Sequence, residues 1–186
     1  MQKINTLYLR DAANPKLVTR EVDPDCKWVI DSYGIATEKI DGSCCAILDG
    51  IFYRRHAHDA QKGEPPAGWV HWSRNDAQRS GHGWLPVSEA PADRWHREAF
   101  SAAIGRADGT YELIGPRVQS NPYGLKVHCL MRHGSRVIEG FPRDHDSIWS
   151  WFAANEPIEG VVWHHPDGRM AKIKRRDFGL PWPVKS

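Results

Sequence analysis

The interpretation of this chain rests on one stretch, Thr37-Glu38-Lys39-Ile40-Asp41-Gly42-Ser43. A lysine amine can attack a nucleotide α-phosphate when a nearby carboxylate holds a metal ion or its waters. A glycine beside them lets the backbone approach the ligand closely. Lys39, Asp41 and Gly42 can fill these three roles. Taken alone, however, a Lys-x-Asp-Gly run is more often a strand that leads into a turn.

Two further clusters favour the chemical interpretation. The first is Tyr111-Glu112-Leu113-Ile114-Gly115, and the second is Glu159-Gly160-Val161-Val162-Trp163, followed by Lys172-Ile173-Lys174. They supply additional carboxylates and lysines downstream of Lys39. Their order and spacing along the chain make the first motif specific.

With these segments in place, the chain resembles the covalent nucleotidyltransferase superfamily, which contains ATP-dependent DNA ligases, RNA ligases and mRNA-capping guanylyltransferases. The residues that carry the resemblance follow the order of the superfamily's motifs: Lys39-Ile40-Asp41-Gly42, Arg54-Arg55, Glu112, Glu159 and Lys172-x-Lys174. Longer stretches are similar to the small RNA ligase family that includes a vertebrate 5′-to-3′ RNA ligase. These stretches are residues 36–45, 93–100, 110–125 and 158–182.

The resemblance implies an α+β fold, an antiparallel-sheet nucleotidyltransferase domain of the ATP-grasp-like adenylation type with a few helices and no OB-fold. Capping guanylyltransferases and most DNA ligases carry an OB-fold after the closing lysine motif, whereas only twelve residues follow Lys174. We therefore expect an RNA ligase. A minimal DNA ligase, a GTP-using capping enzyme and a non-catalytic nucleotide- or RNA-binding module stay open as alternatives.

The resemblance also implies a three-step reaction that uses ATP and Mg²⁺, for which Mn²⁺ can substitute. Lys39 attacks ATP to form lysyl-AMP, AMP passes to an RNA 5′-phosphate, and an RNA 3′-hydroxyl displaces it. The expected partner is RNA with 5′-phosphate and 3′-hydroxyl ends, and no obligate protein partner is expected. The positive charges of Lys172, Lys174 and Mg²⁺ would disfavour the protonated form of Lys39 and stabilise charge developing on the α-phosphate.

The same resemblance assigns roles residue by residue. Lys39, Lys172 and Lys174 are the catalytic residues, and Asp41, Glu112 and Glu159 hold Mg²⁺, largely through its waters. The nucleotide-binding set is Glu38, Ile40, Arg54, Arg55, Glu112 and Val161, with Glu38, Ile40 and Val161 lining the adenine pocket. Of the two arginines, Arg55 is favoured for the nucleotide contact, but the sequence does not decide between them.

Length and composition set the frame for these assignments. A chain of 186 residues with 40% hydrophobic content can bury one substantial core, so we expect a single domain over residues 1–186. No stretch approaches the roughly 18 apolar residues of a membrane helix, and the first residues lack the apolar core of a signal peptide. We therefore expect no membrane contact and a cytoplasmic location.

A net charge of +2 means that nucleic-acid binding requires a local basic patch. The tail offers such a run, either as a phosphate site or as a solvated basic face: Arg169, Lys172, Lys174, Arg175, Arg176 and Lys185. The cysteines Cys26, Cys44, Cys45 and Cys129 form no C-x-x-C pair, and we expect reduced, buried thiols. The pairs His56-x-His58 and His164-His165 lack a cysteine or carboxylate partner at recognisable spacing, so zinc is not favoured.

The local patterns predict the following elements. A hairpin covers residues 44–53 with the turn Asp49-Gly50, and residues 56–92 form an irregular insertion. A helix capped by Asp93 covers about 94–104, and strands cover 110–114 and 126–132. Asn121-Pro122-Tyr123 forms a turn between those strands. A helix capped within Asp144-His145-Asp146-Ser147 runs from about 147 to 154, and a hairpin spans 159–175.

The last hairpin makes a geometric prediction. Lys172 and Lys174 share a face because side chains alternate along a strand. Glu159 joins them when Val161 lies opposite Lys172, which requires a four-residue turn from His165 to Gly168. A three- or five-residue turn would need a bulge.

Overall fold

The computed structural model describes residues 4–72, 80–155 and 157–183. These residues group into two compact units. Residues 41–133 form the central unit, and residues 4–40 together with 134–183 form the terminal unit. Part of the predicted insertion at 56–92, and the predicted contribution of Lys185 to a basic patch, lie outside the described residues.

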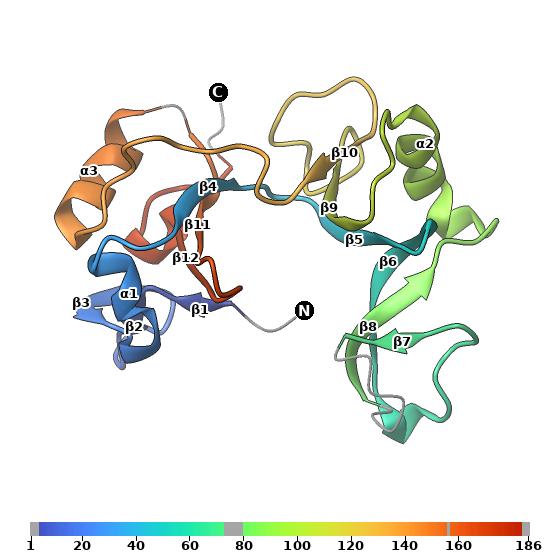
Figure 1. Ribbon diagram of the computed structural model, residues 1–186, viewed down its shortest axis with the longest axis horizontal. Helices are drawn as coiled ribbons and strands as arrows, with labels where there is room; N and C mark the ends of the chain where they lie inside the picture. Colours follow the sequence, from blue (N-terminus) through green and yellow to red (C-terminus); the bar gives the residue numbers. More distant parts are fainter. Residues whose placement is uncertain (1–3, 73–79, 156, 184–186) are drawn as a thin grey trace. The chain divides into compact units, whose positions relative to one another are not determined.

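The terminal unit is built on a four-stranded sheet, with strand order β1-β12-β11-β4 (Figure 1). Its strands are β1 (Asn5–Thr6), β4 (Ile35–Lys39), β11 (Gly160–His164) and β12 (Met170–Lys174). Strand β1 pairs with β12 in parallel, and the other pairs are antiparallel. The remaining elements are the hairpin β2 (Tyr8–Arg10) and β3 (Val18–Val22), the helices α1 (Lys27–Ile30) and α3 (His145–Ala154), and the 3₁₀ turns η1 (Pro24–Cys26) and η4 (Arg175–Phe178).

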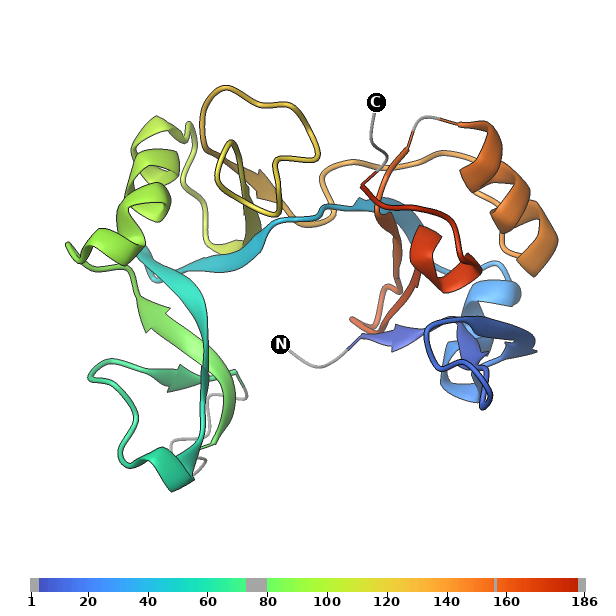
Figure 2. The same cartoon turned by 180° about the vertical axis from the view of Figure 1, so that it is seen from behind.

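One face of this sheet forms the core of the terminal unit. Val161, Trp163 and Ile173 alternate onto that face and are fully buried. Helix α3 packs against them through Ile148 and Phe152 (Figures 1 and 2). The residues between them in each strand point to the opposite face, and these include the predicted lysines.

Helix α3 confirms the prediction made from its cap. The Asp144 side chain accepts a hydrogen bond from the Ser147 amide at 3.0 Å, which satisfies one of the unpaired amides at a helix start. The helix begins at His145, two residues earlier than predicted, and ends at Ala154. None of the helices in the described residues is long and apolar enough to cross a bilayer.

The central unit contains a six-stranded antiparallel sheet, with strand order β10-β9-β5-β6-β8-β7. Its strands are β5 (Ser43–Leu48), β6 (Ile51–His58), β7 (Val70–His71), β8 (Gly81–Pro86), β9 (Gly109–Ile114) and β10 (Cys129–Arg132). Helix α2 (Arg94–Ala102) packs on the sheet through Ala99, and η2 (Ala60–Lys62) and η3 (Pro91–Asp93) are short 3₁₀ turns. With three helices and mostly antiparallel strands among the described residues, the fold is α+β as predicted.

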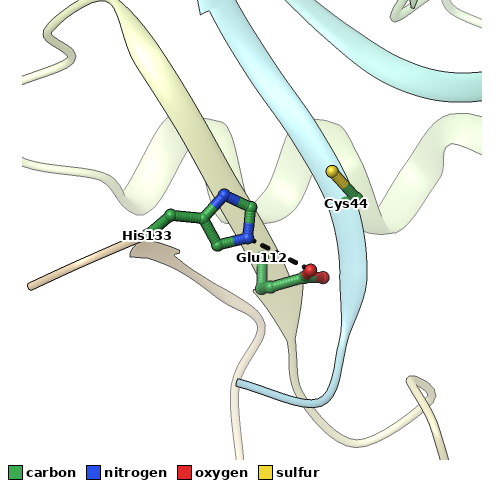
Figure 3. A group of neighbouring side chains, drawn as sticks. All are labelled: Cys44, Glu112 and His133. Carbon is green, nitrogen blue, oxygen red and sulfur yellow. Dashed lines mark hydrogen bonds and ion pairs between the residues drawn. The ribbon is translucent and has the colours of Figure 1, made fainter. Parts of the chain in front are cut away.

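The hairpin of β5 and β6 is confirmed in detail. Leu48 pairs with Ile51, which leaves a two-residue turn. Its residues Asp49 and Gly50 have φ of 52° and 75°, as a type I′ turn requires. Cys44 and Cys45 point to opposite faces of β5: Cys45 is buried in the core, whereas Cys44 lies opposite Glu112 of β9 (Figure 3).

Several local predictions need correction. The stretch predicted as irregular contains regular strands, because β6 continues to His58 and its residues from Tyr53 onward pair with β8. Strand β10 begins at Cys129, later than predicted. Asp93 precedes α2 but makes no side-chain cap, because its carboxylate accepts hydrogen bonds from the Ser88 amide and hydroxyl and pairs with Arg54.

The predicted register of the last hairpin is wrong. Val162, not Val161, lies opposite Lys172, and the connection is the five residues 165–169. The ladder between β11 and β12 shows no register shift. Glu159 precedes β11, so its side chain is not bound to the alternation of the strand.

Candidate active site

Lys39 is the last residue of β4 and stands in a row that crosses three strands. Gly160 of β11 lies opposite Lys39 on one side and opposite Lys174 of β12 on the other. Residues paired across strands share a face, so Lys39 and Lys174 project from the same face of the terminal sheet. Lys172, two residues before Lys174, projects from this face as well.

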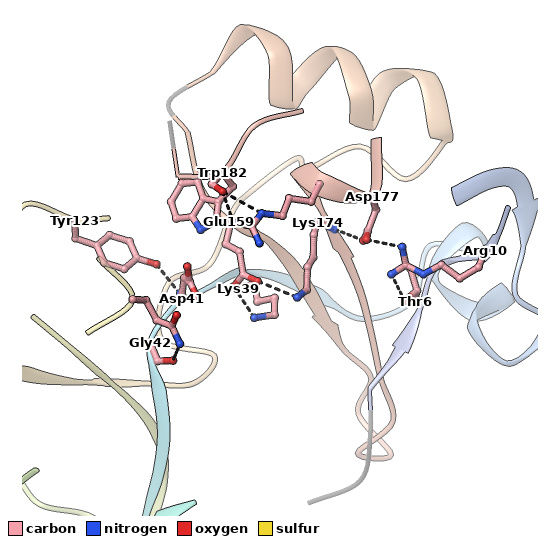
Figure 4. A network of polar contacts seen from close by, with 12 residues as sticks. Thr6, Arg10, Lys39, Asp41, Gly42, Tyr123, Glu159, Lys174, Asp177 and Trp182 are labelled. Carbon is pink, nitrogen blue, oxygen red and sulfur yellow. Dashed lines mark hydrogen bonds and ion pairs between the residues drawn. The ribbon is translucent and has the colours of Figure 1, made fainter. Parts of the chain in front are cut away.

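The carboxylate of Glu159 lies between the two lysines (Figure 4). Its Oε2 is 2.6 Å from Lys39 Nζ, and its Oε1 is 3.0 Å from Lys174 Nζ. The Glu159 side chain is only 8% exposed, against 22% for Lys39 and 31% for Lys174. A single buried negative charge therefore holds two partly exposed ammonium groups.

Gly160 makes this arrangement possible. A Cβ atom built on Gly160 would lie 2.2 Å from the Ile173 carbonyl oxygen, closer than any real contact. Any other residue would push β11 away from β12 and disturb the row of Lys39 and Lys174. The Glu-Gly pair of the sequence motif thus has a structural reason as well as a chemical one.

Lys172 adds a third positive charge to this face. Burial lowers the pKa of its ammonium, and the neighbouring charges of Lys174 and Lys39 lower it further. Asp177 and Glu159 act in the opposite direction but do not outweigh those effects. The structure therefore brings together all three predicted catalytic lysines and Glu159 in the terminal unit.

The three residues predicted to line the adenine pocket differ in burial and in their polar contacts. Val161 is 0% exposed in the core on the face opposite Lys39, which contradicts a direct contact between its side chain and a base. Ile40 is also buried. Glu38 forms an ion pair with Arg136 at 2.9 Å through Oε2, but its buried Oε1 has no hydrogen-bond partner among the described residues.

Asp41 and Gly42 belong to the central unit and are held by the loop after β9. The Asp41 amide donates to the Tyr123 hydroxyl at 2.7 Å, and the Gln119 side chain donates to the Gly42 carbonyl at 3.3 Å. A Cβ on Gly42 would lie 2.4 Å from the Leu113 carbonyl oxygen. The glycine is therefore required for packing against β9, a different reason from the ligand approach expected from sequence.

Glu112 lies on β9 in the central unit, 13% exposed. Its Oε1 is 3.1 Å from His133 Nε2, and its Oε2 is buried without a hydrogen-bond partner among the described residues. The three carboxylates predicted to hold Mg²⁺ thus fall in different units, Asp41 and Glu112 in the central unit and Glu159 in the terminal unit. Sequence reasoning missed His133.

The two candidate arginines on β6 have different surroundings. Arg54 forms an ion pair with the buried Asp93, with Nε 2.8 Å from Oδ1. Arg55 is exposed, and its guanidinium lies over the Trp72 ring and beside His82. Arg54 therefore has a structural role in the central unit.

The basic run of the tail is divided by the fold. Arg175 is buried and donates to the Phe152 carbonyl, and Arg176 donates to the Trp182 carbonyl. The run is therefore not one solvated basic face. Instead, a cavity of about 930 Å³ in the terminal unit gathers basic side chains from both ends of the chain. Those side chains are Arg10, Lys16, Lys172, Lys174 and Arg176.

Known proteins share this sequence pattern. Residues 102–186 match the sequence model of the RNA ligase 1 family. The chain is 25% identical to RNA ligase 1 of Rattus norvegicus, over 81% of the chain and 69% of that protein. It is 29% identical to RNA ligase 1 of Danio rerio, over 80% of the chain and 68% of that protein. Over 63% of the chain and 42% of the relative, it is 32% identical to RNA ligase 1 of Pongo abelii.

These matches place the chain among the RNA ligases, a class of enzymes. Within that class, the chain is a homologue of the vertebrate RNA ligase 1 proteins, and its C-terminal part matches the model of that family. The resemblance to a small RNA ligase family, inferred from the sequence motifs, is thereby confirmed.

Proposed function

We propose that this protein is an ATP-dependent RNA ligase that joins an RNA 5′-phosphate to an RNA 3′-hydroxyl through lysyl-AMP and RNA-adenylate intermediates. The observation that carries the proposal is the contact of Lys39 Nζ with Glu159 Oε2 at 2.6 Å, beside Lys174. This is a lysine nucleophile with a proton acceptor and a second cation on one face of a sheet. The match of residues 102–186 to the RNA ligase 1 family supports the use of ATP and RNA.

The first step requires Lys39 to lose a proton, because an ammonium group is not a nucleophile. Glu159 Oε2 is within hydrogen-bond reach of the Lys39 amine and can accept that proton. The neutral amine then attacks the α-phosphorus as the bond to pyrophosphate breaks. Glu159, once protonated, no longer attracts Lys174 as an anion, so Lys174 is released to contact the phosphate. One proton transfer thus prepares both the nucleophile and the stabilising cation.

Adenine fits an acceptor that the described part of the chain leaves without a hydrogen-bond partner. Glu38 Oε1 is buried without a hydrogen-bond partner among the described residues, which costs free energy that a donor would recover. The exocyclic amino group of adenine is such a donor, whereas guanine has a carbonyl oxygen at the same ring position. Glu38 and Lys39 point to opposite faces of β4, and Lys39 is the last residue of that strand. A nucleotide that contacts both side chains therefore extends around the end of the strand. We therefore propose ATP over GTP.

Mg²⁺ fits part of the predicted carboxylate set. Carboxylate oxygens are the protein ligands that Mg²⁺ takes, and Asp41 and Glu112 offer them, with Glu112 Oε2 buried and without a hydrogen-bond partner among the described residues. Glu159 does not fit this role in the observed arrangement, because both of its oxygens are engaged by lysines. Bound Mg²⁺, or Mn²⁺ in its place, would neutralise charge on the phosphates.

The basic cavity offers a place for further phosphate groups. Lys172, Lys174 and Arg176 line it from the C-terminal segment, and Arg10 and Lys16 line it from the N-terminal hairpin. We propose that phosphates of the RNA substrate bind there, where several cations converge on one concave surface. Of the two candidate arginines on β6, we retain Arg55 for the nucleotide contact, because Arg54 is engaged by Asp93.

The test is nucleotide labelling without RNA. Purified protein with Mg²⁺ and ATP or GTP labelled at the α-phosphate is denatured, and the label bound to protein is counted for wild type, Lys39→Ala and the surface control Lys27→Ala. We expect label from ATP in wild type and Lys27→Ala, and none in Lys39→Ala. Label from GTP would indicate a capping-type enzyme, and no label from either would indicate a binding module.

Substrate choice is tested next with 5′-phosphorylated RNA and with nicked DNA. We expect joining of RNA ends that depends on Lys39. RNA joining by Lys39→Ala would overturn the mechanism, and joining of nicked DNA without RNA joining would overturn the substrate.

A further inference from the structure

The central unit contains a cluster of three different metal-binding groups. The sulfur of Cys44, a carboxylate oxygen of Glu112 and a ring nitrogen of His133 all lie within 4.8 Å of one another (Figure 3). Strand pairing builds the cluster, because Cys44 of β5 lies opposite Glu112 of β9. His133 follows Arg132, the last residue of β10, and its amide donates to the Thr110 carbonyl at 3.1 Å. Thr110 and Glu112 are two residues apart on β9 and share a face, so His133 reaches the Glu112 side chain.

Two further features support the cluster as a metal site. Glu112 Oε2 is buried and has no hydrogen-bond partner among the described residues, and a bound cation would compensate this buried acceptor. The other ring nitrogen of His133, Nδ1, lies 2.8 Å from Thr110 Oγ1, which fixes the ring with Nε2 toward Glu112. Such support of the second ring nitrogen is the usual feature of metal-binding histidines.

We propose that Cys44, Glu112 and His133 bind a thiophilic divalent cation, Zn²⁺ in the first place. Cysteine sulfur, histidine nitrogen and carboxylate oxygen are the three ligand types of protein zinc sites, and three protein ligands leave a fourth position for water. A tetrahedral site needs donor atoms roughly 3.3–3.8 Å apart, so a cluster already within 4.8 Å closes with small side-chain movements. Mg²⁺ is a poor match, because it prefers oxygen ligands alone.

The site shares Glu112 with the nucleotide reaction proposed above. If that proposed function holds, Zn²⁺ bound by Cys44 and His133 takes the Glu112 carboxylate away from Mg²⁺ or the nucleotide. Micromolar Zn²⁺ then inhibits formation of lysyl-AMP, and substitution of Cys44 relieves the inhibition. This second consequence rests on the proposed function, whereas metal binding itself does not.

The binding test uses Co²⁺ as a spectroscopic probe for Zn²⁺ in the full-length, reduced protein without nucleotide. A thiolate bound to Co²⁺ gives a charge-transfer band in the near ultraviolet, and tetrahedral Co²⁺ gives intense visible bands. We expect both in wild type, with Zn²⁺ displacing the Co²⁺ stoichiometrically. The matched control is Cys129→Ser, because Cys129 is also half-buried and lies on β10 of the same sheet.

The variants separate the proposal from its alternatives. Cys44→Ser should abolish the thiolate band, and His133→Gln should weaken Zn²⁺ binding by about 100-fold, whereas Cys129→Ser should change neither. Circular dichroism confirms that each variant is folded, and His133→Gln keeps the test informative if Cys44→Ser does not fold. No thiolate band in wild type, or a band that Cys44→Ser retains, would overturn the site.

The activity arm is measured separately on the same proteins. Lysyl-AMP labelling is followed with rising Zn²⁺ at fixed Mg²⁺. Relief of inhibition in Cys44→Ser supports the shared use of Glu112, and equal inhibition in both proteins overturns it. If no protein is labelled, the proposed function fails while the Co²⁺ result still decides the metal site.

Discussion

A nearly buried glutamate with charged or metal-binding neighbours is found in each of the two units. Glu159 of the terminal unit lies between two ammonium groups, at 2.6 and 3.0 Å. Glu112 of the central unit lies instead beside a thiol and an imidazole, with one oxygen left without a hydrogen-bond partner among the described residues. The negative charge of Glu159 is satisfied by the protein, whereas Glu112 can still accept a cation.

This difference indicates a division of labour. A carboxylate that already holds two lysines is suited to exchange a proton with one of them and to release the other. A carboxylate with an unsatisfied oxygen and soft neighbours is suited to hold a metal ion. The motifs of the sequence treat both glutamates as metal-binding residues, and only their surroundings tell them apart.

The largest expected effect comes from Lys39→Arg. Arginine keeps the positive charge and can still pair with Glu159, but its guanidinium stays protonated and cannot act as the nucleophile. Label from ATP on the denatured protein should therefore fall by about 1,000-fold or more, with little change in the melting temperature. Substantial labelling of Lys39→Arg would mean that another residue is the nucleophile.

A pair of substitutions tests the comparison directly. Glu159→Gln removes the proton acceptor from Lys39, and lysyl-AMP formation should fall by about 100-fold while the Co²⁺ spectrum is unchanged. Glu112→Gln should eliminate the Co²⁺ site. If Glu159→Gln keeps full labelling, or if Glu112→Gln retains the Co²⁺ spectrum, the proposed division of labour is wrong.

Sequence patterns predict the structural features that depend only on neighbouring residues in the chain. The Asp49-Gly50 turn fixes the hairpin of β5 and β6, and the Asp144 cap fixes the start of α3. The approach of Lys174 to Glu159 was also predicted, but through the wrong register. Alternation governs side chains only within a strand, and Glu159 precedes β11.

Features that depend on pairing between distant strands could not be predicted in this way. Residues 81–86 form β8, although their glycines and terminal proline disfavour a strand, because pairing with β6 supplies the hydrogen bonds. Cys44, Glu112 and His133 meet only once β5, β9 and β10 are paired. Arg175 belongs to a basic run in the sequence, yet its donors bind carbonyl oxygens inside the terminal unit.

A smaller effect is expected for Tyr123→Phe, which tests how the central unit holds the residues after Lys39. The variant keeps the ring and removes the hydroxyl that accepts from the Asp41 amide. Loss of one such hydrogen bond costs about 1 kcal/mol. If the contact positions Asp41 for the reaction, labelling should slow by about fivefold.

The control for this substitution is Tyr33→Phe, which alters an exposed tyrosine of the terminal unit. A slowed rate in Tyr123→Phe alone supports a positioning role for the loop after β9. Equal rates in both variants would reduce Tyr123 to a structural contact. A lower melting temperature with an unchanged rate would lead to the same conclusion.

The smallest expected effect is on stability and comes from Lys172→Met. Burial, Lys174 and Lys39 hold the pKa of Lys172 below its ordinary value of 10.5. Between the lowered pKa and 10.5 the unfolded chain binds more protons than the folded chain, so the folded state gains stability as pH rises through that window. Below the window, the charged Lys172 imposes its full cost on folding. Lys172→Met should therefore raise the melting temperature by a few degrees near neutral pH, and the gain should shrink as pH approaches 10.5.

Lys62→Met is the matched control, because Lys62 is exposed and lies in the central unit. The difference in melting temperature between Lys62→Met and wild type should not shrink as pH rises from neutral toward 10.5. The same Lys172→Met protein should lose lysyl-AMP labelling, since the removed charge faces the proposed phosphate site. If Lys172→Met is more stable than wild type but no longer labelled, Lys172 serves the reaction and lowers the stability of the folded protein. A lower melting temperature at neutral pH would show instead that the attraction of Glu159 and Asp177 outweighs the burial and repulsion of Lys172.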